Sequence, residues 1–212
     1  MVYHVYNSSI ADFVIFNNDY EFSRMLMAIR YYQIGASAVN FAHFMNRKKI
    51  KREHDIGKDM RPGKKEKLVE ILAYCLMPTH LHLLLEELKE DGIRKFISLI
   101  LNSYTRYFNI KYHRKGPLWA GRSKKVQIET DEQLIHTTRY IHLNPVTAYI
   151  VDKPEKWPYS SYMEYVSEIR ESKRICRFEH LLRIKPYEYR QFVESGVVYQ
   201  RDLAVMKKVE ID

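Results

Sequence analysis

The sequence predicts an α+β fold built on an antiparallel sheet that helices cover. Two adjacent apolar segments separated by a tight turn indicate a β-hairpin near the middle of the chain. A long amphipathic helix follows this hairpin, and a further strand and helix come after it. Strands and helices are therefore mixed along the chain, which favours an α+β architecture.

The N-terminal segments predict a strand, a return strand and a helix. Val2 to Asn7 alternates and is rich in β-forming residues, and Phe13 to Phe16 is expected to be its hairpin partner. Asn18 or Asp19 can cap a helix that runs to about Gln33 with apolar residues at helical spacing.

The central hairpin and the segments after it complete the predicted sheet. Val69 to Pro78 is expected to be a mostly buried strand, and THLHLLLEEL is expected to pair with it. Asp91 can cap the amphipathic helix, and Lys125 to Glu129 predicts another strand before a helix that reaches Pro145. The order β, β, α, hairpin, α, β, α fits a ferredoxin-like or RRM-like sandwich with helices on one face of the sheet.

Two stretches differ in character from this predicted core. Residues 34–66 are highly charged around RKKIKREHDIGKDMRPGKKEK, which predicts a basic insertion with a helix around Val39 to Lys51. Residues 153–212 hold aromatic segments that favour short helices. We therefore expect one domain over residues 1–152 and a helical C-terminal extension over residues 153–212.

Composition favours an anionic partner. The 212 residues carry a formal net charge of +9, and Gly92 to Ile128 holds nine Lys or Arg without any Asp or Glu. Such a one-sided stretch predicts a surface that faces phosphates, although a basic surface without a ligand remains an alternative. Trp119 among these cations could stack on unpaired bases or pack on the core. The residues predicted to bind DNA are Arg106, Lys111, Arg114, Lys115, Trp119, Arg122, Lys124, Lys125 and Arg139.

Other function classes find no support in the sequence. Cys75 and Cys176 stand far apart, without the spacing of a zinc site or a disulfide framework. The N-terminus lacks the basic and apolar regions of a signal peptide, and no apolar run is long enough to cross a bilayer. We therefore expect a cytoplasmic protein with no membrane partner.

His80 and His82 form the sharpest local feature. They stand two residues apart in a strand of leucines, so both side chains are expected on one face while Leu81, Leu83 and Leu85 enter the core. Two imidazoles placed in this way can converge on one divalent ion, although a pair of hydrogen-bonded histidines would give the same pattern.

A second feature lies on the helix that ends near Pro145. His136, Tyr140 and Asn144 stand four residues apart, which places them along one helix face. A tyrosine can attack phosphorus and hold DNA covalently, although a packing role for Tyr140 is the alternative. Pro145 disfavours helical backbone at Asn144, so the helix could also end before Asn144 points inward.

Three segments taken together resemble a known family. AYCLMPTHLHLLLE, SYTRYFNIKYHRKGPLWAGR and RYIHLNPVTAYIV, in this order, resemble the single-tyrosine HUH transposases, and among them most closely the REP-associated tyrosine transposases. The resemblance covers roughly Val69 to Val151, and YHVYN near the N-terminus also fits.

The resemblance implies an HUH fold, a Mg²⁺ or Mn²⁺ ion and cleavage of single-stranded or hairpin DNA. It places the metal ligands at His80 and His82, the nucleophile at Tyr140 and a third ligand at Asn144, with His136 as an alternative third ligand. Tyr104, Tyr107 and Tyr112 are rival nucleophiles. Relatives act as monomers or as homodimers, and the sequence leaves both open.

The sequence thus predicts a transposase that cuts single-stranded DNA and transfers the strand through a 5′-phosphotyrosine. A binding module that keeps the fold and the basic surface without cutting DNA is the alternative. A metal-dependent nuclease that uses water is a third reading of the same residues.

Overall fold

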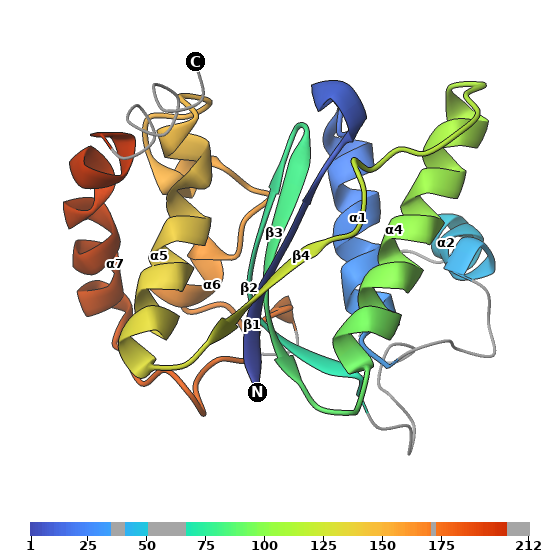
Figure 1. The fold of residues 1–212 in the computed structure, drawn as a ribbon. Coiled ribbons are helices and arrows are strands. Elements are labelled where there is room, and N and C mark those ends of the chain that lie inside the picture. Colours follow the sequence, from blue (N-terminus) through green and yellow to red (C-terminus); the bar gives the residue numbers. More distant parts are fainter. Residues whose placement is uncertain (35–40, 51–66, 171–172, 203–212) are drawn as a thin grey trace.

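The computed structural model describes residues 1–34, 41–50, 67–170 and 173–202. Its centre is a four-stranded antiparallel sheet in the order β2-β3-β1-β4 (Figure 1). The strands are β1 (Val2–Ser8), β2 (Val69–Met77), β3 (His80–Glu87) and β4 (Lys124–Ile128). Together with the helices between them, this order has the βαββαβ form of the ferredoxin-like sandwich, so the predicted α+β class is confirmed.

Helices cover both faces of this sheet (Figure 1). The helices α1 (Asp19–Tyr32) and α4 (Gly92–Lys111) pack on one face, with α2 (Phe41–Ile50) beside them. On the opposite face lie α5 (Asp131–Thr147), α6 (Tyr162–Val166) and α7 (Pro186–Ser195). The expectation of helices on one face is therefore right for α1 and α4 but omits the layer that α5 begins.

Side-chain caps begin two of the helices, and the cap at Asn18 was predicted from the sequence. The Asn18 side chain accepts a hydrogen bond from Glu21 N at the start of α1, and the Thr130 side chain accepts one from Gln133 N at the start of α5. Both caps satisfy backbone N–H groups that a helix leaves without partners in its first turn. Two short 3-10 helices, η1 (Ile10–Asp12) and η3 (Pro154–Lys156), complete the regular structure of the described residues.

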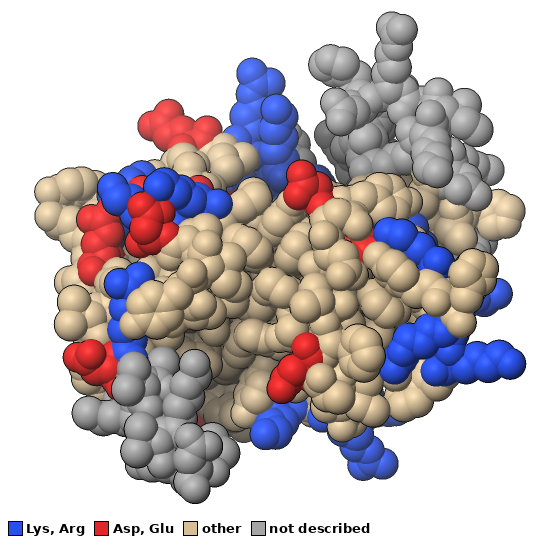
Figure 2. Space-filling model, turned by 90° about the horizontal axis from the view of Figure 1, so that it is seen from above, with Lys and Arg blue, Asp and Glu red and all other residues tan. Residues whose placement is uncertain are grey.

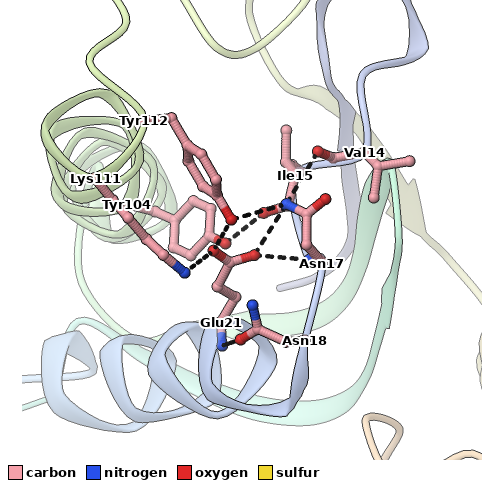
Figure 3. A network of polar contacts seen from close by, with 8 residues as sticks. All are labelled: Val14, Ile15, Asn17, Asn18, Glu21, Tyr104, Lys111 and Tyr112. Carbon is pink, nitrogen blue, oxygen red and sulfur yellow. Dashed lines mark hydrogen bonds and ion pairs between the residues drawn. The ribbon is translucent and has the colours of Figure 1, made fainter.

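Glu21 holds α1 against α4 through a buried polar network (Figure 3). Its carboxylate accepts hydrogen bonds from Lys111 Nζ and Tyr112 Oη, each at 2.6 Å, and from Asn17 N at 2.7 Å. Burial raises the pKa of Glu21, but the donors Lys111, Tyr112 and Asn17 lower it, and the net direction is downward. A buried charge is tolerated because these partners replace the water that it loses.

The C-terminal extension packs on the edge of the sheet and on α5. Leu76 N donates to Tyr159 O and Ser161 N donates to Tyr74 O, so residues 159–161 run along the free edge of β2. The fully buried His142 of α5 pairs with Tyr189 Oη and Ser161 Oγ, both at 2.7 Å. The predicted boundary at residue 152 stays a prediction.

Three local expectations differ from the structure or fall outside it. Residues 13–16 form no strand; Ile15 N and Phe16 N donate to Pro78 O, and both side chains are buried. The helix predicted near residues 39–51 is α2, whereas most of the predicted basic insertion, including residues 51–66, lies outside the described residues. Helix α5 continues through Pro145 to Thr147, although the proline removes one backbone hydrogen bond there.

Within the described ranges, no helix combines the length and the apolar character needed to cross a bilayer.

Candidate active site

A cluster of three histidines lies on the sheet face that α5 covers. The alternation of β3 places His80 and His82 on the same face, with ring centroids 5.2 Å apart, and buries Leu81, Leu83 and Leu85. The neighbouring strand β1 adds His4, whose Nε2 lies 3.0 Å from His82 Nδ1. We call His4, His80 and His82 the histidine cluster.

Burial keeps the histidine cluster neutral. It lowers the pKa of His4 to about 4 and lowers that of His82 well below its ordinary value, where His4 and His80 add to the effect. Burial also lowers the pKa of His80, and the nearby charge of Asp12 acts in the opposite direction. Neutral imidazole is the form that can bind a metal ion, so the cluster is in the right protonation state at neutral pH.

Hydrogen bonds occupy one nitrogen of each of the two strand β3 histidines. His80 Nδ1 lies 3.0 Å from Thr79 Oγ1, and His82 Nδ1 pairs with His4. The Nε2 atoms of both rings make no hydrogen bond within the described part of the chain. Across that same part, no group of three or more His, Cys, Asp or Glu side chains has an arrangement suited to a metal ion. For a metal ion at the histidine cluster, the protein itself therefore offers two imidazole nitrogens, His80 Nε2 and His82 Nε2.

Tyr140 lies over the histidine cluster. Helix α5 places its ring centroid 5.6 Å from that of His82 and 5.9 Å from that of His4, both in edge-on contact. The side chain is 38% exposed, so an extended substrate can reach it. Burial and Tyr6 raise the pKa of Tyr140, whereas a hydrogen bond from Asn144 lowers it, and the phenol is protonated at neutral pH.

The other two residues of this helix face have different neighbours. Asn144 Nδ2 donates to Tyr140 O at 3.0 Å, so the side chain folds back along α5 beside the tyrosine. His136 Nδ1 accepts a hydrogen bond from Arg139 at 2.9 Å, and its ring meets Phe192 of α7. Asn144 and His136 are both within one or two turns of Tyr140, and neither shows a ring contact or hydrogen bond with the histidine cluster in the described structure.

The rival tyrosines Tyr104 and Tyr107 lie on α4 and Tyr112 follows its last residue, across the sheet from the histidine cluster. The hydroxyl of the buried Tyr104 donates to Ile15 O at 2.5 Å, and that of Tyr112 donates to Glu21. The Tyr107 hydroxyl is buried, and the Tyr107 ring lies beside Lys111. The geometry therefore leaves Tyr140, and not these three, beside the histidines.

Two residues of the candidate site were missed from the sequence. His4 and Tyr6 share the site face of β1, and the Tyr6 ring stacks on His82 with centroids 5.8 Å apart. The signal was present in the alternation of YHVY, which places a histidine and a tyrosine on one face of a strand. What the alternation does not show is that β1 pairs with β3 at the register that joins Tyr6 to His82.

The basic stretch from residue 92 to 128 is less one-sided in space than in sequence. Acidic residues from other segments pair with three of its cations: Glu21 with Lys111 at 2.6 Å, Asp91 with Arg94 at 2.9 Å and Glu87 with Lys125 at 3.5 Å. Figure 2 shows Lys and Arg in separate groups toward the rim of one face, with acidic residues among them. A single continuous phosphate-facing surface is therefore not what this face presents.

Individual members of the predicted DNA-binding set also differ in their surroundings. Trp119 is 9% exposed and its indole N–H donates to Thr105 Oγ1 at 3.1 Å, so it packs in the core and cannot stack on bases. Arg139 lies over the Phe192 ring, between α5 and α7. Within the predicted set, Arg106, Lys115, Arg122 and Lys124 are exposed and show no ion pair with a described residue.

Comparison with known proteins supports the family predicted from the sequence. Residues 42–144 match the family described as Transposase IS200 like. The predicted resemblance to IS200-like transposases is confirmed. The matched segment holds β2, β3, α4, β4 and α5 up to Asn144, and therefore includes His80, His82 and Tyr140.

Two individual proteins extend this IS200-like match. A curated protein of Haemophilus influenzae, provisionally described as a REP-associated tyrosine transposase, is 29% identical over 103 residues, which cover 44% of this chain and 58% of that protein. A solved structure of a REP-associated tyrosine transposase bound to a REP hairpin aligns with a TM-score of 0.50 and 17% identity, over 84% of this chain and 86% of that one. This second likeness shows a shared fold.

Proposed function

We propose that this chain cuts single-stranded DNA by attack of Tyr140 on the backbone and passes the strand to a 3′-hydroxyl. The observation that carries the proposal is the position of an accessible tyrosine directly over paired histidines, on the helix and strand that the IS200-like match includes. A nucleophile next to groups that can stabilise phosphate charge is what phosphoryl transfer needs.

The proposed reaction has two balanced steps. In the first, Tyr140 Oη forms a bond to phosphorus and gives its proton to water, while the bond from phosphorus to the 3′-oxygen breaks and that oxygen takes a proton from water, which leaves a 5′-phosphotyrosine and a free 3′-hydroxyl. In the second, a 3′-hydroxyl attacks the phosphotyrosine, and Tyr140 leaves and regains its proton. Because burial raises the pKa of Tyr140, the phenol must lose its proton during attack and not before it.

We propose a divalent ion as part of the site, supported by the two neutral imidazoles of His80 and His82 on one strand face. His80 and His82 would bind Mg²⁺ or Mn²⁺ through their Nε2 atoms, and His4 would hold His82 in the required orientation through its hydrogen bond. Such an ion, when bound, polarises the scissile phosphate and stabilises its developing charge. These ions prefer oxygen ligands, so the Asn144 amide and phosphate oxygens of the DNA would complete the coordination.

A trapping experiment tests the proposal. The chain is incubated with single-stranded hairpin DNA from the flanks of its gene in the presence of Mn²⁺, and a covalent protein–DNA adduct is sought on a denaturing gel. We expect an adduct with the original chain, none with Tyr140→Phe, and unchanged DNA binding in that variant. Tyr149→Phe is the matched control, because Tyr149 is 69% exposed just after α5.

The outcomes separate the alternatives. An adduct that persists in Tyr140→Phe and disappears in Tyr6→Phe would move the nucleophile to β1, where Tyr6 also contacts His82. Cutting without an adduct would favour a nuclease that uses water. Binding without cutting would favour a binding module. This is the second candidate function, because the histidine cluster contains no carboxylate among the described residues.

A further inference from the structure

A cavity adjoins Tyr140 and His4. It measures about 340 Å³ and opens between β4 and the first half of α5, with His4 and Tyr140 in its wall. Its volume falls at the lower end of the range of small-ligand pockets, about 300–1,000 Å³. Because it adjoins the proposed nucleophile, whatever occupies it lies next to the reacting phosphate.

The strand side of the cavity is apolar. Val126 and Ile128 line it and share one face of β4, and Val126 stands opposite His4 in the β1–β4 pairing. Val126 is 51% exposed on an edge strand, so this apolar surface faces an open space and not the core. A flat apolar wall of this kind suits the face of an aromatic ring, such as an unpaired nucleobase.

The helix side of the cavity is polar and its hydrogen-bonding roles are fixed. Arg139 donates to His136 Nδ1, so the neutral ring carries its proton on Nε2 and can donate from there. Gln133 Oε1 accepts from Glu129 N, which leaves the amide NH₂ group as a donor without a partner in the described structure. Thr137 adds a hydroxyl to the same wall. These groups can read the acceptor-bearing edge of a base.

One cation, Lys124, lies between this cavity and the histidine cluster, where a DNA phosphate would meet it. Lys124 lies two residues before Val126 on the same face of β4, and its Nζ stands 5.8 Å from the Tyr6 ring centroid. Within the described chain it makes no ion pair. A phosphate held at Lys124 would be near Tyr6, whose ring stacks on His82.

We propose that this cavity binds one nucleobase of single-stranded DNA, that of a nucleotide adjoining the phosphate that Tyr140 attacks. The base lies on Val126 and Ile128, and its acceptor atoms accept hydrogen bonds from Gln133, His136 and Thr137. The inference rests on the proposed function and adds to it a source of sequence preference supplied by the protein itself. It also explains why an edge strand keeps apolar residues exposed beside a basic one.

Binding of simple oligonucleotides tests the cavity without any chemistry. Oligo(dT), oligo(dA) and oligo(dC) of about twelve nucleotides, long enough to span a single-strand site, are titrated with the full chain in EDTA and followed by fluorescence anisotropy. Thr137→Phe fills the cavity, and Gln133→Ala removes one donor. Glu132→Phe is the matched control, because it adds the same ring on an exposed position of α5 outside the cavity.

The expected result is a loss of discrimination among bases. The original chain and Glu132→Phe should prefer one oligomer, Thr137→Phe should bind that oligomer about tenfold more weakly, and Gln133→Ala should fall between them, as expected for loss of one base contact. Unchanged preference in Thr137→Phe would overturn the inference, and so would equal weakening toward all three oligomers. The adduct assay tests the proposed function separately, since an adduct can form whether or not the cavity reads a base.

Discussion

The two faces of the sheet each hold a polar cluster, and the two clusters differ in whether their polar atoms have hydrogen-bond partners. On the α1–α4 face, the Glu21 carboxylate accepts hydrogen bonds from Lys111, Tyr112 and Asn17 and is closed to solvent (Figure 3). On the α5 face, His80 and His82 keep nitrogen atoms that have no partner among the described residues, beside an accessible Tyr140.

This difference separates a structural role from a functional one. A buried polar group whose partners are complete stabilises one packing arrangement, and its loss is felt in folding. Polar groups that are buried with binding atoms left over are costly to keep, and such costs concentrate at functional sites. We therefore expect variants of the Glu21 network to change stability and variants of the histidine cluster to change chemistry.

The largest effect is expected for His82→Ala. Loss of this imidazole should slow formation of the DNA adduct by about a thousandfold or more, because the phosphate charge loses its stabilisation. The unfolding free energy, measured in urea, should change by only about 1 kcal/mol. His43→Ala, at an exposed histidine on α2, should leave both properties unchanged. An adduct rate within about tenfold of the original in His82→Ala would break the distinction between the two clusters.

The opposite pattern is expected for Glu21→Ala. Removal of the carboxylate leaves Lys111 and Tyr112 without their acceptor and should lower the unfolding free energy by about 3 kcal/mol, discounted because Lys111 is partly exposed. Adduct formation per folded molecule should not change. Asp152→Ala is the control, because its pair with Lys156 is exposed and should not affect unfolding. Reduced chemistry in a fully folded Glu21→Ala protein would contradict the assignment.

A third, smaller effect concerns pH. Burial lowers the pKa of His142 to about 3, so below pH 6.5 the unfolded chain binds a proton that the folded chain does not. His142 therefore contributes stability that is present above pH 6.5 and is lost as the pH falls toward 3. The loss between pH 7 and pH 5 should be about 2 kcal/mol, and His142→Phe should reduce this pH dependence. The lowered pKa values of His4 and His82 act in the same direction, so part of the dependence should remain.

Much of this comparison could be predicted from the sequence, for a clear physical reason. His80 and His82 alternate with leucines, and a period of two fixes which face of a strand each residue occupies. The long apolar face of α4 and the cap at Asn18 are equally local signals. Such features need only neighbours along the chain, and they were found.

The features that were missed depend on contacts between distant segments. The strand pairing that joins His4 and Tyr6 to His82 cannot be read from β1 alone. Residues 13–16 have strand-like composition, but Ile15 and Phe16 find their backbone partner at Pro78. Residues 92–128 contain no acidic residue, and this predicted a one-sided basic surface. In the fold, Glu21, Glu87 and Asp91 from outside the stretch pair with its cations.

The smallest predicted effect tests how the C-terminal extension supports the catalytic face. Gln200 is 8% exposed, and its side-chain amide donates to Tyr140 O at 3.1 Å, so it ties the segment after α7 to the helix turn that carries the proposed nucleophile. A Cβ added at Gly196 would lie 2.7 Å from Arg139 Cδ, which shows how closely this segment approaches α5.

Gln200→Ala should therefore lower the unfolding free energy by about 1 kcal/mol, the net value of one hydrogen bond. It should also slow adduct formation by a few-fold, because the Tyr140 backbone gains freedom to leave its attack position. The matched control is Gln191→Ala on the exposed face of α7, which should change neither. If Gln200→Ala loses stability but keeps the full adduct rate, the extension only stabilises the fold. If Gln200→Ala slows the reaction and Gln191→Ala does not, the orientation of Tyr140 depends on a contact sixty residues away along the chain. The C-terminal extension would then contribute to the reaction as well as to the stability of the domain.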